Sequence, residues 1–163
     1  MPAAGTEVDK PAAQGAVMEI SVSRQDLLKE LTATQSVVER KTTIPILSNF
    51  LLEVEGDRMH ITATDLDQAI RTSTAVKVKK AGACTIPARK LYDYIKLLPD
   101  GDLSIKLLEN HWVQIRSGRS NTKMVGMARA NYPQVPEFPT VAVTSISVPA
   151  LKTLIARTIF AIS

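Results

Sequence analysis

The sequence predicts an α+β fold in which two helices pack against antiparallel sheets. Three stretches share one strand–turn–helix pattern: "ISVSRQDLLKELTAT", "TIPARKLYDYIKLLP" and "ISVPALKTLIARTIFAIS". The last strand residues before these helices are Val22, Ile86 and Val148, which are 64 and 62 residues apart. A period this constant indicates copies of one supersecondary unit that bury their apolar faces against each other.

The first unit is expected to follow a disordered tail, residues 1–17, which is rich in Ala, Pro and Gly and has no periodicity. Residues 19–22 alternate as a strand does, and Ser23 is a suitable N-cap. Leu27 and Leu31 then follow at helical spacing. Three strand-like runs with alternating apolar residues come next, at 46–55, 58–65 and 68–79.

The second unit has the same order of elements. "CTIP" is a strand, and residues 88–98 form a helix that Pro99 cannot extend. Three further strand-like runs lie at 103–109, 111–117 and 121–128. Two units, each a strand, a helix and three strands, therefore predict one domain over residues 18–130.

A proline-rich linker is expected at 131–142, as an extended connector to another domain. Residues 143–163 repeat only the opening strand and helix of the unit, and the apolar stripe of that helix has no sheet to cover it. The sequence is therefore expected to be part of a longer protein, with 143–163 as the truncated start of a second domain.

Few residues have the pattern of a catalytic or metal site. No His-x-x-x-His or Cys-x-x-Cys spacing, glycine-rich phosphate loop or Gly-x-Ser-x-Gly motif occurs, so neither a cofactor nor a metal is expected. Asp65 and Asp67 are the one carboxylate pair that could hold magnesium, which leaves a small metal-dependent phosphoesterase as the alternative function. The simpler interpretation is that this pair caps a hairpin between two strands.

The compartment is expected to be the cytoplasm. Cys84 is the only cysteine, so no internal disulfide can form, and it is expected to be a small core residue. No apolar run approaches the ~18 residues that span a bilayer, and the N-terminus lacks the pattern of a signal peptide. No membrane association is therefore predicted.

Basic residues on the three predicted helices point to a polyanionic partner. The net charge of +4 and the pI near 9.3 permit such a partner without requiring it. If the units repeat in space, their helices form one surface that presents Lys and Arg without an aromatic stacking platform. Such a surface suits a duplex phosphate backbone read without sequence preference. The basic helix residues are Arg24, Lys29, Arg89, Lys90, Lys96, Lys152 and Arg157. Arg40 and Lys41 lie in the loop after the first predicted helix.

Five motifs together resemble a known family. "TTIPILSNFLLEV", "ITATDLD", "TIPARKLYDYIKLLP", "IRSGRS" and "NYPQVPEFP" are similar, in this order, to segments of the bacterial DNA polymerase III β subunit, the sliding clamp. The resemblance implies a DNA-clamp fold with three domains per chain. Two chains would join head to tail as a homodimer ring around double-stranded DNA, with helices lining the hole and sheets outside. The ring would tether the replicative polymerase for processive replication and have no active site of its own.

The resemblance also assigns residues. The family's DNA-binding positions correspond to Lys41, where relatives often have arginine, and to Arg89; Arg24 and Lys96 extend the expected basic surface. The strand used in ring closure corresponds to about 119–126. Its expected dimer-interface residues are Arg119, Thr122 and Met124, and relatives have an aromatic residue near Thr122. The groove for the polymerase catalytic subunit and the clamp loader lies between the second and third domains, which this chain lacks.

Overall fold

The computed structural model describes residues 16–38, 42–137, 141 and 143–162. The predicted tail over 1–17 therefore lies almost entirely outside the described residues. The helices are α1 (Arg24–Thr34), α2 (Ala88–Leu97) and α3 (Val148–Thr158). The strands are β1 (Met18–Ser23), β2 (Asn49–Glu55), β3 (Arg58–Thr64), β4 (Ala69–Ala75), β5 (Lys77–Lys80), β6 (Ala83–Pro87), β7 (Asp102–Leu107), β8 (Trp112–Ser117) and β9 (Ser120–Val125).

Two antiparallel sheets form the body, as the sequence predicted. One sheet has the strand order β5-β1-β7-β8-β9, and the other has the order β4-β3-β2-β6. The opening strand of each predicted unit pairs with a strand of the other unit: β1 pairs with β7, and β6 pairs with β2. The two units are therefore not separate bodies, because each completes its partner's sheet.

Three predicted strands differ from the structure. The opening strand expected before the third helix is wrong, because residues 143–147 form no strand and Val148 is already the first residue of α3. The run at 46–55 begins with a short 3-10 helix, Pro45–Ser48, because a proline at the first helical position fixes φ and needs no amide partner. The run at 68–79 is wrong as a single strand. It breaks at Val76, whose amide donates to Asp57 O at 2.9 Å, and the chain leaves one sheet for the other there. Alternation continues across this break, so periodicity alone could not reveal it.

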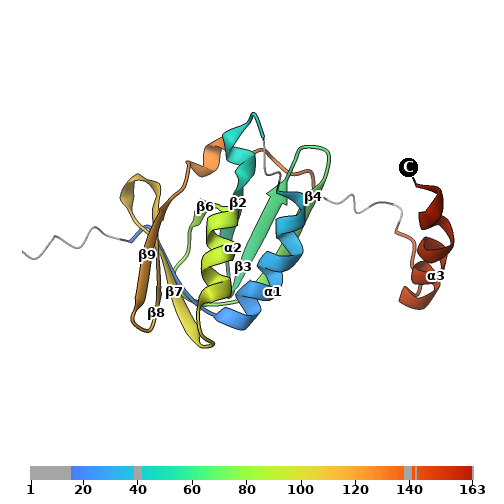
Figure 1. Ribbon diagram of the computed structural model, residues 1–163. Helices are drawn as coiled ribbons and strands as arrows, with labels where there is room; N and C mark the ends of the chain where they lie inside the picture. Colours follow the sequence, from blue (N-terminus) through green and yellow to red (C-terminus); the bar gives the residue numbers. More distant parts are fainter. Residues whose placement is uncertain (1–15, 39–41, 138–140, 142, 163) are drawn as a thin grey trace, which may run out of the picture.

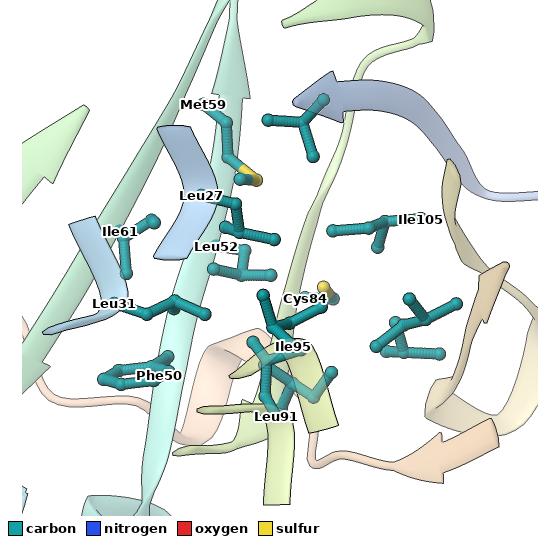
Figure 2. Packing of buried hydrophobic residues seen from close by; sticks show 14 of the residues in the cluster. Leu27, Leu31, Phe50, Leu52, Met59, Ile61, Cys84, Leu91, Ile95 and Ile105 are labelled. Atoms are coloured by element: carbon teal, nitrogen blue, oxygen red, sulfur yellow. The ribbon is translucent and has the colours of Figure 1, made fainter. Parts of the chain in front are cut away.

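The core lies between the helices and both sheets. In Figure 1, α1 and α2 lie side by side, with α1 against β3 and β4 and α2 against β2 and β6. Figure 2 shows Leu27 and Leu31 of α1 and Leu91 and Ile95 of α2 in one cluster with the sheet residues. All four side chains are fully buried, and each contributes roughly 1.5–3 kcal/mol through removal of apolar surface from water.

The predicted core position of Cys84 is confirmed. Its side chain lies on β6 among the core residues in Figure 2 and is 3% exposed. Burial raises the pKa of the Cys84 thiol to about 12, so the thiol stays protonated and unreactive in the folded protein.

A threonine and a glycine join the two sheets where the chain leaves β9. Thr85 Oγ1 on β6 accepts hydrogen bonds from Asn49 Nδ2 (3.1 Å) and Met127 N (2.7 Å), and it donates to Met127 O (2.8 Å). The backbone of Gly126 passes so close that an added Cβ would lie 1.8 Å from Thr85 O. Only glycine fits at this crossing.

Glu19 joins three strands on the outer face of the five-stranded sheet. Its Oε1 lies 3.1 Å from Lys79 Nζ and 3.1 Å from Lys106 Nζ, so one carboxylate links β5, β1 and β7. Hydrogen bonds from Lys79 and then Lys106 lower the pKa of Glu19, because they favour its charged form.

The chain continues beyond this body to α3. Ser147 caps this helix, since its side chain accepts from the amide of Ala150 at 3.4 Å. All described residues from Val148 to Ile162 are exposed, and Figure 1 shows α3 apart from the sheets. None of the described helices has the length and apolar character needed to cross a membrane.

We predict that Gly126→Ala destabilises the fold. The new methyl group forces the backbone away from Thr85 O, which strains the hydrogen bonds of Thr85 and costs about 1–3 kcal/mol. Urea unfolding followed by circular dichroism measures this loss. The control is Gly118→Asn, at an open position with φ of +54° where asparagine is tolerated, and it should leave the unfolding midpoint almost unchanged. An equal effect of both substitutions would contradict the proposed close contact.

A second prediction concerns Glu19 and pH. Because the folded-state pKa is lowered, Glu19 adds to stability above the ordinary carboxyl value of 4.5, and this contribution is lost as the pH falls through the lowered value. Glu19→Gln should therefore be less stable than wild type near neutral pH, and the difference should shrink below about pH 4.5. Denaturant unfolding at a series of pH values tests this, with the exposed Glu109→Gln as control. A difference that does not change with pH would contradict the role assigned to the carboxylate.

Candidate nucleic-acid interface

The exposed face of α2 carries two of the predicted DNA-binding residues. α2 begins directly after β6, with the buried Ala88 turned toward the core and Arg89 turned to solvent. Arg89 and Lys96 are seven residues apart, so they lie on the same side of the helix, two turns or roughly 10 Å apart. Two exposed cations at this separation can contact a phosphate backbone without reading bases.

Both cations are only lightly engaged within the protein. Arg89 Nε lies 3.8 Å from Asp93 Oδ2, and both side chains are more than half exposed. A solvent-exposed pair of this kind contributes little, so the guanidinium can exchange Asp93 for another anion at low cost. Lys96 Nζ lies 6.0 Å from the centre of the Tyr92 ring, at the outer limit of a cation–π contact. Lys90 is also exposed on this helix.

Arg24 is placed differently from the other predicted DNA-binding residues. Its guanidinium donates to Ile95 O (3.1 Å), to Lys96 O (2.8 Å) and to Asp100 Oδ1 (2.9 Å), and its side chain is only 17% exposed. Gln25 adds a hydrogen bond to the other oxygen of Asp100 at 3.1 Å. Arg24 therefore joins the start of α1 to the C-terminal end of α2, where a cation is favoured by the unpaired carbonyls. A phosphate would have to compete for these donors.

Lys41, the remaining predicted DNA-binding residue, lies outside the described residues. The chain is described again from Thr42, whose hydroxyl accepts from the amide of Ile44 at 3.0 Å. The contribution of Lys41 stays a prediction.

The predicted dimer-interface residues lie on or next to an edge strand. β9 pairs with β8 and is the last strand of its sheet. Thr122 and Met124 stand opposite Ile115 and Val113, so both point to the core side of the sheet, and Met124 is 9% exposed. Arg119 is exposed in the tight turn between β8 and β9. An edge strand with unpaired backbone groups can pair with a strand of another chain.

The carboxylate pair has a structural role in a turn. Asp65 Oδ1 accepts from the amides of Asp67 (3.0 Å) and Gln68 (2.6 Å), and this arrangement shapes the turn between β3 and β4. The hairpin interpretation is thus confirmed for the Asp65 carboxylate, while Asp67 takes part through its backbone amide. Within the described residues, no group of three or more His, Cys, Asp or Glu side chains is arranged to hold a metal ion.

The fold agrees with the comparison to known proteins. Residues 18–136 match the family described as "DNA polymerase III beta subunit, N-terminal domain", and they make up most of the chain. The chain belongs to this family. The resemblance seen in the sequence motifs is therefore confirmed.

Relatives within the family share the sequence and the fold of this domain. The beta sliding clamp of Caulobacter vibrioides is 38% identical over 148 residues, which cover 90% of this chain and 40% of that protein. A beta sliding clamp sequence from Vibrio harveyi is 32% identical over 88% of this chain and 99% of that sequence. A solved sliding clamp from Caulobacter crescentus has a TM-score of 0.82 at 38% identity, with 90% of this chain and 40% of that chain covered.

A more distant clamp structure, from Bacillus subtilis, has a TM-score of 0.86 at 25% identity and covers 91% of this chain and 41% of that chain. The chain thus spans about 40% of the length of most of these relatives. The family domain is shared, and the activity of the longer proteins is a separate question.

Sequence reasoning grouped Arg24 with the other helix cations and did not find its contact with α2. The partners Ile95, Lys96 and Asp100 are more than 70 residues away in the chain. No local pattern marks this contact. The one available signal is that Arg24 opens α1 at the end where a helix disfavours a cation, which suggests a role outside its own helix.

We predict that Arg24→Ala lowers the free energy of unfolding by more than it lowers the free energy of DNA binding. Removing a part-buried guanidinium that holds α2 should cost about 2 kcal/mol, because hydrogen bonds that involve a charged group are among the stronger ones. Chemical unfolding measures the loss, with the exposed Arg116→Ala on β8 as a control that should change stability by less than about 0.5 kcal/mol. Equal stability of wild type and Arg24→Ala would show that Arg24 does not hold the helices together.

Proposed function

We propose that this chain provides the first domain of a sliding clamp, a non-catalytic cytoplasmic subunit that encircles duplex DNA and tethers the replicative DNA polymerase. In this proposal, α1 and α2 face the DNA and the two sheets form part of the outer wall. The observation that carries the proposal is the pair Arg89 and Lys96, exposed on one side of α2 in a domain of the clamp family.

The charge arrangement supports binding without sequence preference. The cations of α2 are exposed and weakly paired. The two aromatic residues of this helix, Tyr92 and Tyr94, are half-buried, so neither offers a fully exposed ring for stacking on bases. Loose contacts of this type allow a protein to move along DNA, because counterion release is similar at every position. A ring would then retain DNA by closure rather than by tight binding.

Ring closure is proposed to use the open edge of β9. Met124 lies in this edge strand on the core side of the sheet and is 9% exposed, so only a small part of its side chain can reach a partner, and Arg119 supplies a charge at the turn. Thr122 is half-buried and small, where the family resemblance implies an aromatic residue, so Met124 is proposed as the apolar contact at this edge in this chain. The polymerase and the clamp loader are proposed to bind outside this domain.

The first test is duplex binding by the chain itself. At low ionic strength, binding to a labelled duplex should be weak and independent of sequence, and log K should fall linearly with log salt concentration. Arg89→Gln and Lys96→Gln should each lower the magnitude of this slope by about 0.9, the amount expected for one lost phosphate contact. Fluorescence anisotropy measures K. The control Arg58→Gln, on β3 away from the helices, should leave the slope unchanged.

A second test places the domain in a complete clamp. Residues 18–136 replace the corresponding domain of the Caulobacter crescentus clamp, which is 38% identical to this chain. The chimera should assemble, stay on circular DNA after loading, and leave when the circle is linearised. A chimera that folds and dimerises but does not stay on circular DNA would contradict the proposed function.

A further inference from the structure

A groove crosses the outer face of the four-stranded sheet, on the side away from the helices. Leu52 on β2 points into the core, so its neighbours Leu51 and Glu53 point to the opposite face. Residues 129–137, here called the strap, run over this face and leave a groove of about 820 Å³ between themselves and the sheet. Thr62 on β3 and Arg71 on β4 complete the floor.

The strap is fixed where it enters the groove. Tyr132 is 6% exposed and packs with Ile46, Leu47 and Leu51, and its hydroxyl donates to Thr62 O at 3.2 Å. Arg129 donates to Glu53 Oε1 through Nε at 3.0 Å and through Nη2. Arg129 and Tyr132 thus hold one end of the strap in place, and a volume between roughly 300 and 1,000 Å³ is typical of ligand-binding sites in proteins.

One guanidinium in the groove is available to a ligand. Arg71 Nη2 lies 3.9 Å from Glu53 Oε2, which is too far for a hydrogen bond, and within the described residues its guanidinium donates no hydrogen bond. Glu53 is already paired with Arg129, so its charge is shared between two arginines. A carboxylate from outside would give Arg71 a bidentate partner, which is the geometry that guanidinium groups favour.

The strap itself offers apolar and backbone contacts beside this cation. Pro133 and Val135 line the groove and are half-buried, so they present apolar surface to it. The amides of Gln134 and Val135 donate no hydrogen bond to any described residue. An extended peptide can pair with such a segment through its backbone while one apolar side chain enters the groove.

We propose that the strap groove binds an extended peptide segment of a partner protein, with a carboxylate on Arg71 and an apolar side chain against Leu51 and Val135. The groove is on the face opposite α1 and α2, so a bound peptide would leave the proposed DNA surface free. The inference goes beyond the proposed function and does not depend on it.

A displayed library of random heptapeptides, selected on the full chain, tests the proposal. The selected peptides should share an acidic residue or a terminal carboxylate next to an aliphatic or aromatic residue. Fluorescence anisotropy with the best synthetic peptide should give at least ten-fold weaker binding to Arg71→Gln. The matched control is Arg58→Gln. Arg58 lies on the same sheet face, where it donates to Ser73 outside the groove, so its substitution should change binding less than two-fold. Circular dichroism confirms that both variants are folded.

Other outcomes would overturn the proposal. A selection without a shared motif, or a peptide that binds Arg71→Gln as tightly as wild type, would show that the groove does not take peptides. Sedimentation velocity provides the test for a second copy of the chain: a dimer that is lost in Arg71→Gln would mean that self-association occupies the groove. Peptide binding should persist in Arg89→Gln, because Arg89 lies on the opposite face from the groove. A negative result in the peptide experiment would therefore not contradict the proposed DNA binding, and a negative result in the DNA experiment would not contradict peptide binding.

Discussion

The exchange of opening strands between the two units is the constraint on which the structure depends. β1 and its neighbour β5 extend a sheet of three strands from the second unit, and β6 completes a sheet of three strands from the first. Each helix follows its opening strand directly, so the exchange brings α1 and α2 side by side over one shared core. Neither unit can bury its apolar face alone, and the domain is therefore expected to fold as one cooperative body.

This arrangement divides the arginines of the domain into two kinds. Arg24 and Arg129 join segments more than 70 residues apart, through carbonyl groups or through Glu53. Arg89 and Arg71 are exposed, and among the described residues each makes only a long contact with a carboxylate, at 3.8 and 3.9 Å. An arginine of the first kind stabilises the domain, while one of the second kind can exchange its weak partner for an external anion. The two exposed arginines lie on opposite faces, so the domain has a weakly paired guanidinium on each of two separate faces.

Much of this fold could be predicted from the sequence because helix and strand periodicities are local signals. The strand–helix steps at Val22 and Ile86, the turn at Asp65 and the core position of Cys84 all follow from short patterns, whereas the third copy at Val148 forms only its helix. The break at Val76 could not be predicted, because alternation continues while the hydrogen-bonding partner changes from β3 to β1. In the candidate site, too, local patterns were predictable and contacts between distant segments were not. The exposed positions of Arg89 and Lys96 were predictable from helical spacing, whereas the burial of Arg24 depends on residues from α2 and its following turn.

The strap groove illustrates why function in this domain is hard to see in the sequence. Its floor combines alternate residues of three strands, and its wall is a proline-rich segment that composition alone assigns to a connector. Tyr132 makes the difference, because its buried ring and its hydrogen bond to Thr62 hold the connector against the sheet. A linker anchored in this way no longer acts as a free spacer. It becomes part of the domain surface, and the amides of Gln134 and Val135, unpaired among the described residues, are available to the extended peptide that we propose for the groove.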